Sequence, residues 1–196
     1  MKKALIILLS ALMLISLTAC GGDESDKKAP IGTDVEYYVK IGKIPEIEYA
    51  LGHDADEIKT KLEESHKDAV EGTDDLYEHD HTGENYIGTY DNGKVTIIAT
   101  TGINYYYESD KKAEGISRIV SLKGGYGFET GALIIEIKEA MESYGHKSEE
   151  RKITQSEAEN NGLTADMTCL EYTFDKNKVM FVFSENALGA IILLKA

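Results

Sequence analysis

The sequence is poor in positive charge. It has 21 lysine and arginine residues against 35 aspartate and glutamate residues, and its formal net charge at pH 7 is −14. Because the phosphates of a nucleic acid repel so acidic a body, we expect no nucleic-acid partner. The same charge predicts that the folded part of the chain stands off an anionic membrane surface.

The sequence also lacks the motifs on which common reaction centres are built. It has no nucleophile elbow, no phosphate-binding loop and no repeated Cys motif. Gly124-Gly125-Tyr126-Gly127 precedes an expected helix, but the Lys-Ser/Thr pair of a P-loop is missing, and we interpret the segment as a flexible joint. The carboxylates are too many and too scattered to nominate a catalytic pair. We therefore expect no enzyme and predict no catalytic residue.

No apolar run is long enough to cross a membrane as a helix. Lys2 and Lys3 give the chain a positive start, and the almost wholly apolar stretch Ala4–Leu17 follows. A spanning helix needs about 20 residues, whereas a shorter run after basic residues is typical of the apolar region of an export signal. Leu17-Thr18-Ala19-Cys20 ends this run.

These four residues resemble the bacterial lipobox, in which a Leu and two small residues precede a Cys. The resemblance implies that residues 1–19 are a signal peptide, that Cys20 carries diacylglycerol and an acyl chain such as palmitate, and that the mature protein begins at Cys20. Acyl chains contribute about 0.8 kcal/mol per buried methylene, so two or three of them anchor a protein firmly. We expect a lipoprotein on the extracytoplasmic face of the cell membrane. The alternative is an ordinary signal peptide with an incidental cysteine.

Cysteine is scarce, since Cys169 is the only other one. With lipid on Cys20, Cys169 would have no partner within the chain for a disulfide bond. Its neighbours alternate as in a strand, so we expect a buried structural thiol. Residues 20–33 are small, charged and Gly/Pro-bearing, which is typical of a lipidated tether.

The rest of the chain predicts an α+β protein. Apolar periodicity and turn residues predict strands within 35–50, a helix over 54–66, a hairpin over 86–100 around Asn92-Gly93, strands over 103–108 and 116–122, a helix from about 130 to 145, a polar loop over 146–166, and strands over 168–174, 179–184 and 190–195.

The order of helix and then hairpin occurs twice, and its residues align. Gly52 and the triplet Glu57-Ile58-Lys59 match Gly131 and Glu136-Ile137-Lys138, while Tyr90-Asp91 and Lys94-Val95 match Phe174-Asp175 and Lys178-Val179. We predict an internal duplication with a first repeat over 34–123 and a second over 124–196. Each repeat would be one helix packed on an antiparallel sheet of three or four strands.

This pattern resembles the tandem-repeat fold of beta-lactamase inhibitory protein and of small outer-surface lipoproteins built from related αβ repeats. The resemblance implies a binding or interaction module whose concave sheet face holds an unknown protein or peptide partner. It implies no catalytic residue. Beta-lactamase inhibitory protein carries disulfides that the mature chain could not form internally, so inhibition of a beta-lactamase is not inferred.

Tyr105-Tyr106-Tyr107 is the first candidate binding surface. In a strand Tyr105 and Tyr107 share one face and Tyr106 takes the other. Tyrosine combines a large contact area with a polar tip and is enriched in interfaces. We predict partner binding through Tyr105 and Tyr107; the alternative is that one of these faces packs the helix.

Glu78-His79-Asp80-His81 is the second candidate. His-x-His on an extended segment places both imidazoles on one side, where His79 and His81 could share a zinc or copper ion. His53, His66 or an aspartate could complete the ligand set. The alternative is a solvated acidic loop, in which case the protein has no cofactor apart from its lipid.

Overall fold

The computed structural model describes residues 31–65, 70–72, 86–90 and 93–196. The helices and strands follow in the order α2 (Ile31–Lys40), α3 (Ala55–Ser65), β1 (Val70–Gly72), β2 (Tyr86–Tyr90), β3 (Val95–Thr100), β4 (Ile103–Glu108), the 3₁₀ segment η1 (Ser109–Glu114), β5 (Arg118–Ser121), α4 (Ile134–Ser143), β6 (Glu149–Lys152), α5 (Gln155–Asn160), β7 (Thr168–Phe174), β8 (Asn177–Ser184) and β9 (Ala187–Lys195).

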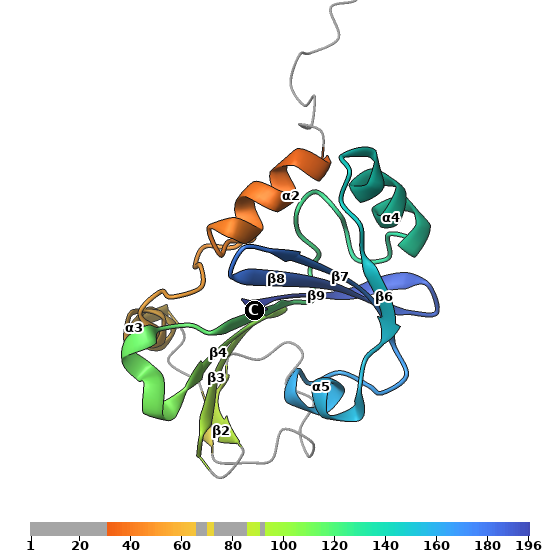
Figure 1. Cartoon of the computed structure of the whole chain (residues 1–196). Coiled ribbons are helices and arrows are strands. Elements are labelled where there is room, and N and C mark those ends of the chain that lie inside the picture. The colour runs from red at the N-terminus through yellow and green to blue at the C-terminus, as the bar shows by residue number, and fades with distance from the viewer. Residues whose placement is uncertain (1–30, 66–69, 73–85, 91–92) are drawn as a thin grey trace, which may run out of the picture.

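The described strands form one nine-stranded sheet in the order β1-β2-β3-β4-β5-β9-β8-β7-β6. Neighbouring strands are antiparallel, except that β1 runs parallel to β2. The two halves of the chain meet where β5 pairs with β9, with Val120 opposite Ile192. In Figure 1 the strands β2–β4 turn away from the plane of β7–β9, so the sheet is strongly curved.

Helices cover both faces of the sheet. Figure 1 shows α2 and α4 above β7–β9 and α5 below them. One hydrophobic core joins α2, α3 and α4 to the upper face and includes Ile119 of β5 and Leu193 of β9. A second core, between the sheet and α5, contains Tyr106, Val120 and Cys169. Because strand residues point alternately to the two faces, Ile119 and Val120 contribute to different cores.

Helix α3 forms where the apolar spacing predicts it. Ala55, Ile58 and Leu62 recur at helical intervals and are all buried. The helix begins after Asp54, whose Oδ1 accepts a hydrogen bond of 2.8 Å from the backbone N–H of Asp56. The predictions of strands over 86–90, 95–100, 103–108 and 168–174 are confirmed as well, and the later strands differ by only a few residues.

The predicted strands in Val35–Ala50 are wrong, because this segment begins as the helix α2. Val35 and Val39 are four residues apart and fully buried, so they form the inner stripe of a helix that packs on β7, β8 and α4. Their β-branched side chains favour strands, but burial of this stripe outweighs that preference. The last residues assigned to the tether, 31–33, also belong to α2; residues 20–30 lie outside the described part of the chain.

The prediction of two tandem repeats is also wrong. The sheet is continuous and its upper core draws residues from both halves of the chain, so neither half encloses a core of its own. The halves also differ in construction: β1 joins its neighbour in parallel, whereas β6 joins β7 antiparallel, and α5 interrupts the second half. What the structure confirms is the mixed α+β class.

The predicted polar loop over 146–166 contains β6 and α5. The four residues of β6 are polar, because this strand forms an edge of the sheet and faces solvent on most of its surface. Helix α5 starts at a capping box, in which Thr154 Oγ1 accepts from the N–H of Glu157 and a Glu157 oxygen accepts from the N–H of Thr154. The helix predicted from Thr130 begins later, at Ile134.

None of the helices in the described part of the chain has the length and apolar character needed to cross a membrane.

Candidate functional site: a cleft beside helix α5

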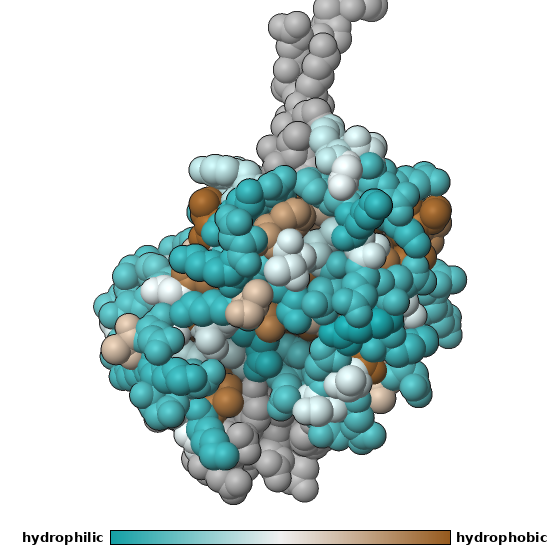
Figure 2. All heavy atoms as spheres, in the orientation of Figure 1, coloured by the Kyte–Doolittle hydropathy of each residue, from teal (hydrophilic) through white to brown (hydrophobic). Residues whose placement is uncertain are grey.

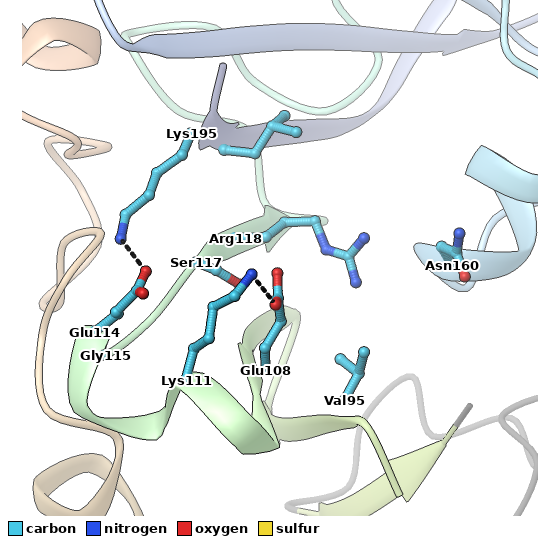
Figure 3. Close-up of a pocket in the computed structure, with 10 residues that line it drawn as sticks. Val95, Glu108, Lys111, Glu114, Gly115, Ser117, Arg118, Asn160 and Lys195 are labelled. Atoms are coloured by element: carbon cyan, nitrogen blue, oxygen red, sulfur yellow. Dashed lines mark ion pairs between the residues drawn. The ribbon is translucent and has the colours of Figure 1, made fainter. Parts of the chain in front are cut away.

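A cleft of about 450 Å³ opens on the sheet face that carries α5. We call it the α5 cleft. Its walls come from the start of β3, the end of β4, η1, β5, the end of β9 and the last residue of α5 (Figure 3). The lining residues are Val95, Glu108, Lys111, Glu114, Gly115, Ser117, Arg118, Asn160, Leu194 and Lys195.

Arg118 projects into this cleft from the start of β5. The strand register places it opposite Tyr106 of β4, and its Cζ atom lies 4.1 Å from the centroid of the Tyr106 ring. The N–H of Ser117 donates to the Tyr106 carbonyl at 2.8 Å, which fixes the approach of the two strands. Tyr106 is itself 1% exposed, so the guanidinium makes a cation–π contact with a buried ring.

The two lysines of the cleft are paired with carboxylates. Lys111 forms an ion pair with Glu108, and Lys195 lies 3.9 Å from Glu114. The hydrogen bond to Glu108 raises the pKa of Lys111, so this lysine stays charged at neutral pH. Figure 3 shows the Arg118 side chain directed away from both pairs, toward Asn160. The Arg118 guanidinium therefore lies apart from the two lysine–carboxylate pairs (Figure 3).

Two of the remaining lining residues are aliphatic. Val95 and Leu194 are both half-buried and pack against the core under α5. Asn160 contributes an amide from α5, on the opposite side of the cleft from η1 (Figure 3). The lining hydroxyl, that of Ser117, donates to the carbonyl of Tyr106 rather than to a base. A cation stacked on an aromatic ring, with two aliphatic side chains in the same lining, is an arrangement suited to binding.

The structure places the predicted tyrosines differently. Tyr105 and Tyr107 share a face as expected, but that face packs in the core that includes residues of α2, α3 and α4. Tyr105 is 3% exposed and packs edge-on against Tyr49, with ring centroids 5.7 Å apart. Burial raises its pKa. The prediction that Tyr105 contacts a partner is therefore wrong, because its side chain belongs to the core; Tyr107 is half-buried beside it.

Cys20, His79 and His81 lie outside the described residues, so the predictions of lipidation and of metal binding remain predictions. The same holds for His66. His53 is described, and its Nε2 lies 3.2 Å from Glu57. Within the described part of the chain, no three His, Cys, Asp or Glu side chains gather as a metal-binding group.

Two other interpretations can be compared with the structure. Cys169 is fully buried in β7, as predicted, and burial raises the pKa of its thiol. The glycine-rich segment is less free than a flexible joint, because Glu46 accepts hydrogen bonds from the N–H groups of Tyr126 (3.0 Å) and Gly127 (2.9 Å). A carboxylate of the chain itself thus occupies the amides that resembled a phosphate cradle.

Sequence reasoning missed Arg118 and Asn160 as site residues. The signal for Arg118 was a cation inside the stretch Ile116–Leu122, which is predicted as a strand and whose other residues are uncharged. Asn160 had no signal, because its helix falls in a segment that reads as a polar loop.

Taken together, the fold and site define a mixed α+β protein with a cation-centred cleft on one face of a curved sheet. No known protein family matches the chain, and no curated protein matches it. Among solved structures it is similar to the crystal structure of a DUF4309 family protein (YjgB) from Bacillus subtilis subsp. subtilis str. 168. The identity is 12%, the match covers 87% of this chain and 100% of that chain, and the TM-score is 0.47. A similarity of this size assigns neither a family nor a function.

Proposed function

We propose that the protein is a lipid-anchored extracytoplasmic binding module that holds its partner in the α5 cleft. The main support is the cleft itself, in which Arg118 stacks on the buried ring of Tyr106 and Val95 and Leu194 add aliphatic side chains to the lining. The anchor is supported by Leu17-Thr18-Ala19-Cys20 at the end of an apolar signal-like run. Binding is preferred to catalysis because the lining hydroxyl of Ser117 is bonded to the backbone.

The anchor is tested by metabolic labelling of the full chain in a bacterial host with an alkyne analogue of palmitate. The expected result is label on the wild-type protein and none on Cys20→Ala. The signal peptide of Cys20→Ala should also remain uncleaved. Cys169→Ala is the matched control and should label as the wild type does, because its thiol is fully buried. Equal labelling of Cys20→Ala would disprove the anchor.

The binding site is tested by blocking the mouth of the cleft. Asn160→Trp places a large ring at the end of α5 beside the lining residues. Gln155→Trp, on the exposed first residue of the same helix and outside the lining, is the matched control. Capture of envelope components by the immobilised protein should fall for Asn160→Trp and persist for Gln155→Trp. Equal capture by both variants would exclude the cleft as the binding site.

A further inference from the structure

We infer that the outer side of helix α2 rests on the lipid bilayer that holds the anchor, with Tyr37 and Ile41 in the headgroup region. This inference rests on the anchor in the proposed function and adds a second membrane contact, which fixes the orientation of the folded part. It depends on where the exposed apolar side chains lie, on the charge of α2 and on the length of chain between Cys20 and α2.

The exposed apolar side chains gather on one side of the molecule. In the described part of the chain, the large hydrophobic residues that are exposed all belong to α2, to α4 or to a position directly next to one of these helices. They are Tyr37, Ile41, Leu133, Ile135 and Tyr144. Helices α2 and α4 pack together over the same face of the sheet (Figure 1). Figure 2 shows apolar surface, in brown, at the upper flank on the α2 side and at the upper flank on the α4 side.

Tyr37 and Ile41 form an outward stripe on α2. The N–H of Ile41 donates to the carbonyl of Tyr37 at 3.2 Å, so the helical turn continues to Ile41 and places the two side chains on the same side. They are 59% and 49% exposed, whereas Val35 and Val39 are fully buried. The Tyr37 ring meets the Tyr38 ring edge-on, with centroids 5.2 Å apart, which restricts its orientation. A tyrosine combines an apolar ring with a polar tip, so it suits the interface between lipid and water.

The charge of α2 allows this contact although the whole chain is acidic, with a net charge of −14. Over residues 31–43 the acidic residues Asp34 and Glu36 are balanced by Lys40 and Lys43. Glu36 and Lys40 also form an ion pair with each other, at 2.6 Å. Helix α4 is more acidic, with three glutamates to one lysine. The excess of negative charge therefore lies outside α2, and α2 is the helix that can approach lipid headgroups without net repulsion.

The length of chain after the anchor keeps α2 near the bilayer. Residues 20–30 separate the anchored cysteine from Ile31, the first residue of α2. A segment of this length spans at most about 40 Å when it is fully extended. The contact of α2 with lipid is therefore intramolecular, so a stripe too small to bind a bilayer by itself can still occupy it.

This contact also sets the direction of the α5 cleft. The cleft opens on the sheet face that carries α5, and α2 lies on the other face (Figure 1). With α2 against the bilayer, the cleft is turned away from the membrane surface. A partner outside the membrane could then enter the cleft while the protein stays anchored.

The sequence contains no tryptophan, so a single introduced indole reports on one position. Tyr37→Trp is prepared as the lipidated full chain and reconstituted in vesicles of brominated phosphatidylcholine, whose bromine atoms quench indoles that touch the lipid. Gln155→Trp, on the exposed first residue of α5, is the matched control on the opposite side of the sheet. Relative to unbrominated vesicles, the emission of Tyr37→Trp should fall about twofold, and that of Gln155→Trp should not change.

A second substitution tests the stripe rather than the probe. Adding Ile41→Asp to Tyr37→Trp should abolish the quenching, because a carboxylate is costly to transfer from water into lipid. Adding Gln155→Asp to Tyr37→Trp makes the same change in net charge on α5 and should leave the quenching unchanged. Both positions are exposed, and thermal unfolding of each variant shows that it is folded.

Equal quenching of Tyr37→Trp and Gln155→Trp, no quenching of either, or full quenching in the presence of Ile41→Asp would overturn the inference. A blue-shifted emission of Tyr37→Trp that bromine does not quench would place α2 against protein, such as a second copy of the chain, and would overturn it as well.

The proposed function fails in other experiments. Equal palmitate labelling of Cys20→Ala and wild type would remove the anchor and, with it, this inference. Equal capture by Asn160→Trp and Gln155→Trp would exclude the cleft but leave the contact of α2 with the membrane intact. A labelled wild-type protein without quenching of Tyr37→Trp would keep the anchor and overturn only the contact.

Discussion

At the scale of single residues, three successive tyrosines show how strand alternation assigns different roles to one side-chain type. Tyr105 lies in the core under the helices, Tyr106 supports Arg118 on the opposite face, and Tyr107 returns to the first face, half-buried. The sequence predicts the alternation correctly. The sequence does not show which of the two faces packs against α2, α3 and α4, because these helices are separated from β4 along the chain.

The first prediction concerns Tyr105→Ala. Removing its buried ring should lower the free energy of unfolding by about 3–5 kcal/mol, the range for large aromatic truncations, because the cavity is enclosed by Tyr49 and its neighbours. Urea denaturation measures the change. Tyr105→Phe keeps the ring and serves as the control. A loss below about 0.5 kcal/mol would contradict the burial of this side chain.

Glu157 is another residue whose surroundings can be tested, through pH. Its two oxygens meet Arg151 Nη2 and Nη1 at 2.6 and 2.8 Å, and the hydrogen bond to Arg151 is the main reason that its pKa is lowered to about 2. A carboxyl whose pKa is lowered by folding stabilises the native state above its unfolded pKa. That contribution is lost as the pH falls toward the folded pKa.

The second prediction follows from this sign. The free energy of unfolding should decrease between about pH 5 and pH 2, and Glu157→Gln should show a smaller decrease over this window, because Gln cannot titrate. Chemical denaturation at several pH values measures the slope. Glu159→Gln, which makes the same substitution on the same helix, is the matched control. Identical slopes for wild type and Glu157→Gln would refute the role of the Arg151 pair.

At the scale of secondary-structure elements, helix α2 depends on a distant side chain. The Nδ2 atom of Asn177, at the start of β8, donates to the carbonyl oxygens of Val39 (2.8 Å) and Lys40 (3.1 Å). The last carbonyls of a helix have no partner within it, so this amide completes the C-terminal end of α2. Asn177 is 3% exposed, which makes its donors costly to remove.

The third prediction is that Asn177→Ala lowers the free energy of unfolding by about 1–3 kcal/mol, because the carbonyls of Val39 and Lys40 each lose the side-chain donor and that of Val39 keeps only the N–H of Gly42. Asn177→Asp should be at least as harmful, since it replaces the donor by a negative charge near a helix C-terminus. Denaturant titration measures both. Lys176→Ala, at the preceding exposed position, is the control. Wild-type stability in both Asn177 variants would show that the amide does not hold α2.

The elements also show where prediction from sequence succeeds. Helix α3 and the strands β7 and β8 carry clear apolar periods, so local pattern and tertiary burial agree. In α2 they disagree, because Val35 and Val39 have strand preference but pack as a helical stripe. Strand β6 has no apolar period at all, and it is a strand only because β7 offers it a hydrogen-bonding edge.

At the scale of the whole molecule, one core unites the two halves of the chain. It contains Ile98 of β3 and Phe181 of β8 together with Ile137 of α4. Because these side chains share their neighbours, unfolding of one half would expose the other. The internal matches in sequence misled the prediction, since the same pattern of helix and hairpin here builds two ends of a single sheet.

The fourth prediction is that the whole protein unfolds as one unit. Ile137→Val should lower the free energy of unfolding by about 0.5–1.5 kcal/mol. The slowest backbone amides of β3 and of β8 should lose this same amount of protection, although the substituted residue lies in α4 and in neither strand. Native-state hydrogen exchange measures both strands. Unchanged protection in β3 would instead indicate two independently unfolding parts.

The candidate site could be predicted only in part. A cation within an otherwise uncharged stretch was visible in the sequence at Arg118. The cleft, however, is assembled from β3, β4, η1, β5, α5 and β9, and no local pattern brings the ends of these elements together. The pairing of β5 with β9 brings Arg118 and Leu194 to neighbouring strands, and no short-range motif encodes that pairing.

The pairing of β5 with β9 has a consequence for folding during synthesis. Strand β9 is the last strand in chain order, yet it lies in the middle of the sheet, between β5 and β8. While the ribosome is still making residues 187–195, the backbone of β5 lacks its β9 partner. The core above the sheet also lacks Ile191 and Leu193. The sheet can close only after synthesis has passed these residues, so the chain cannot complete its fold before this central strand has been made.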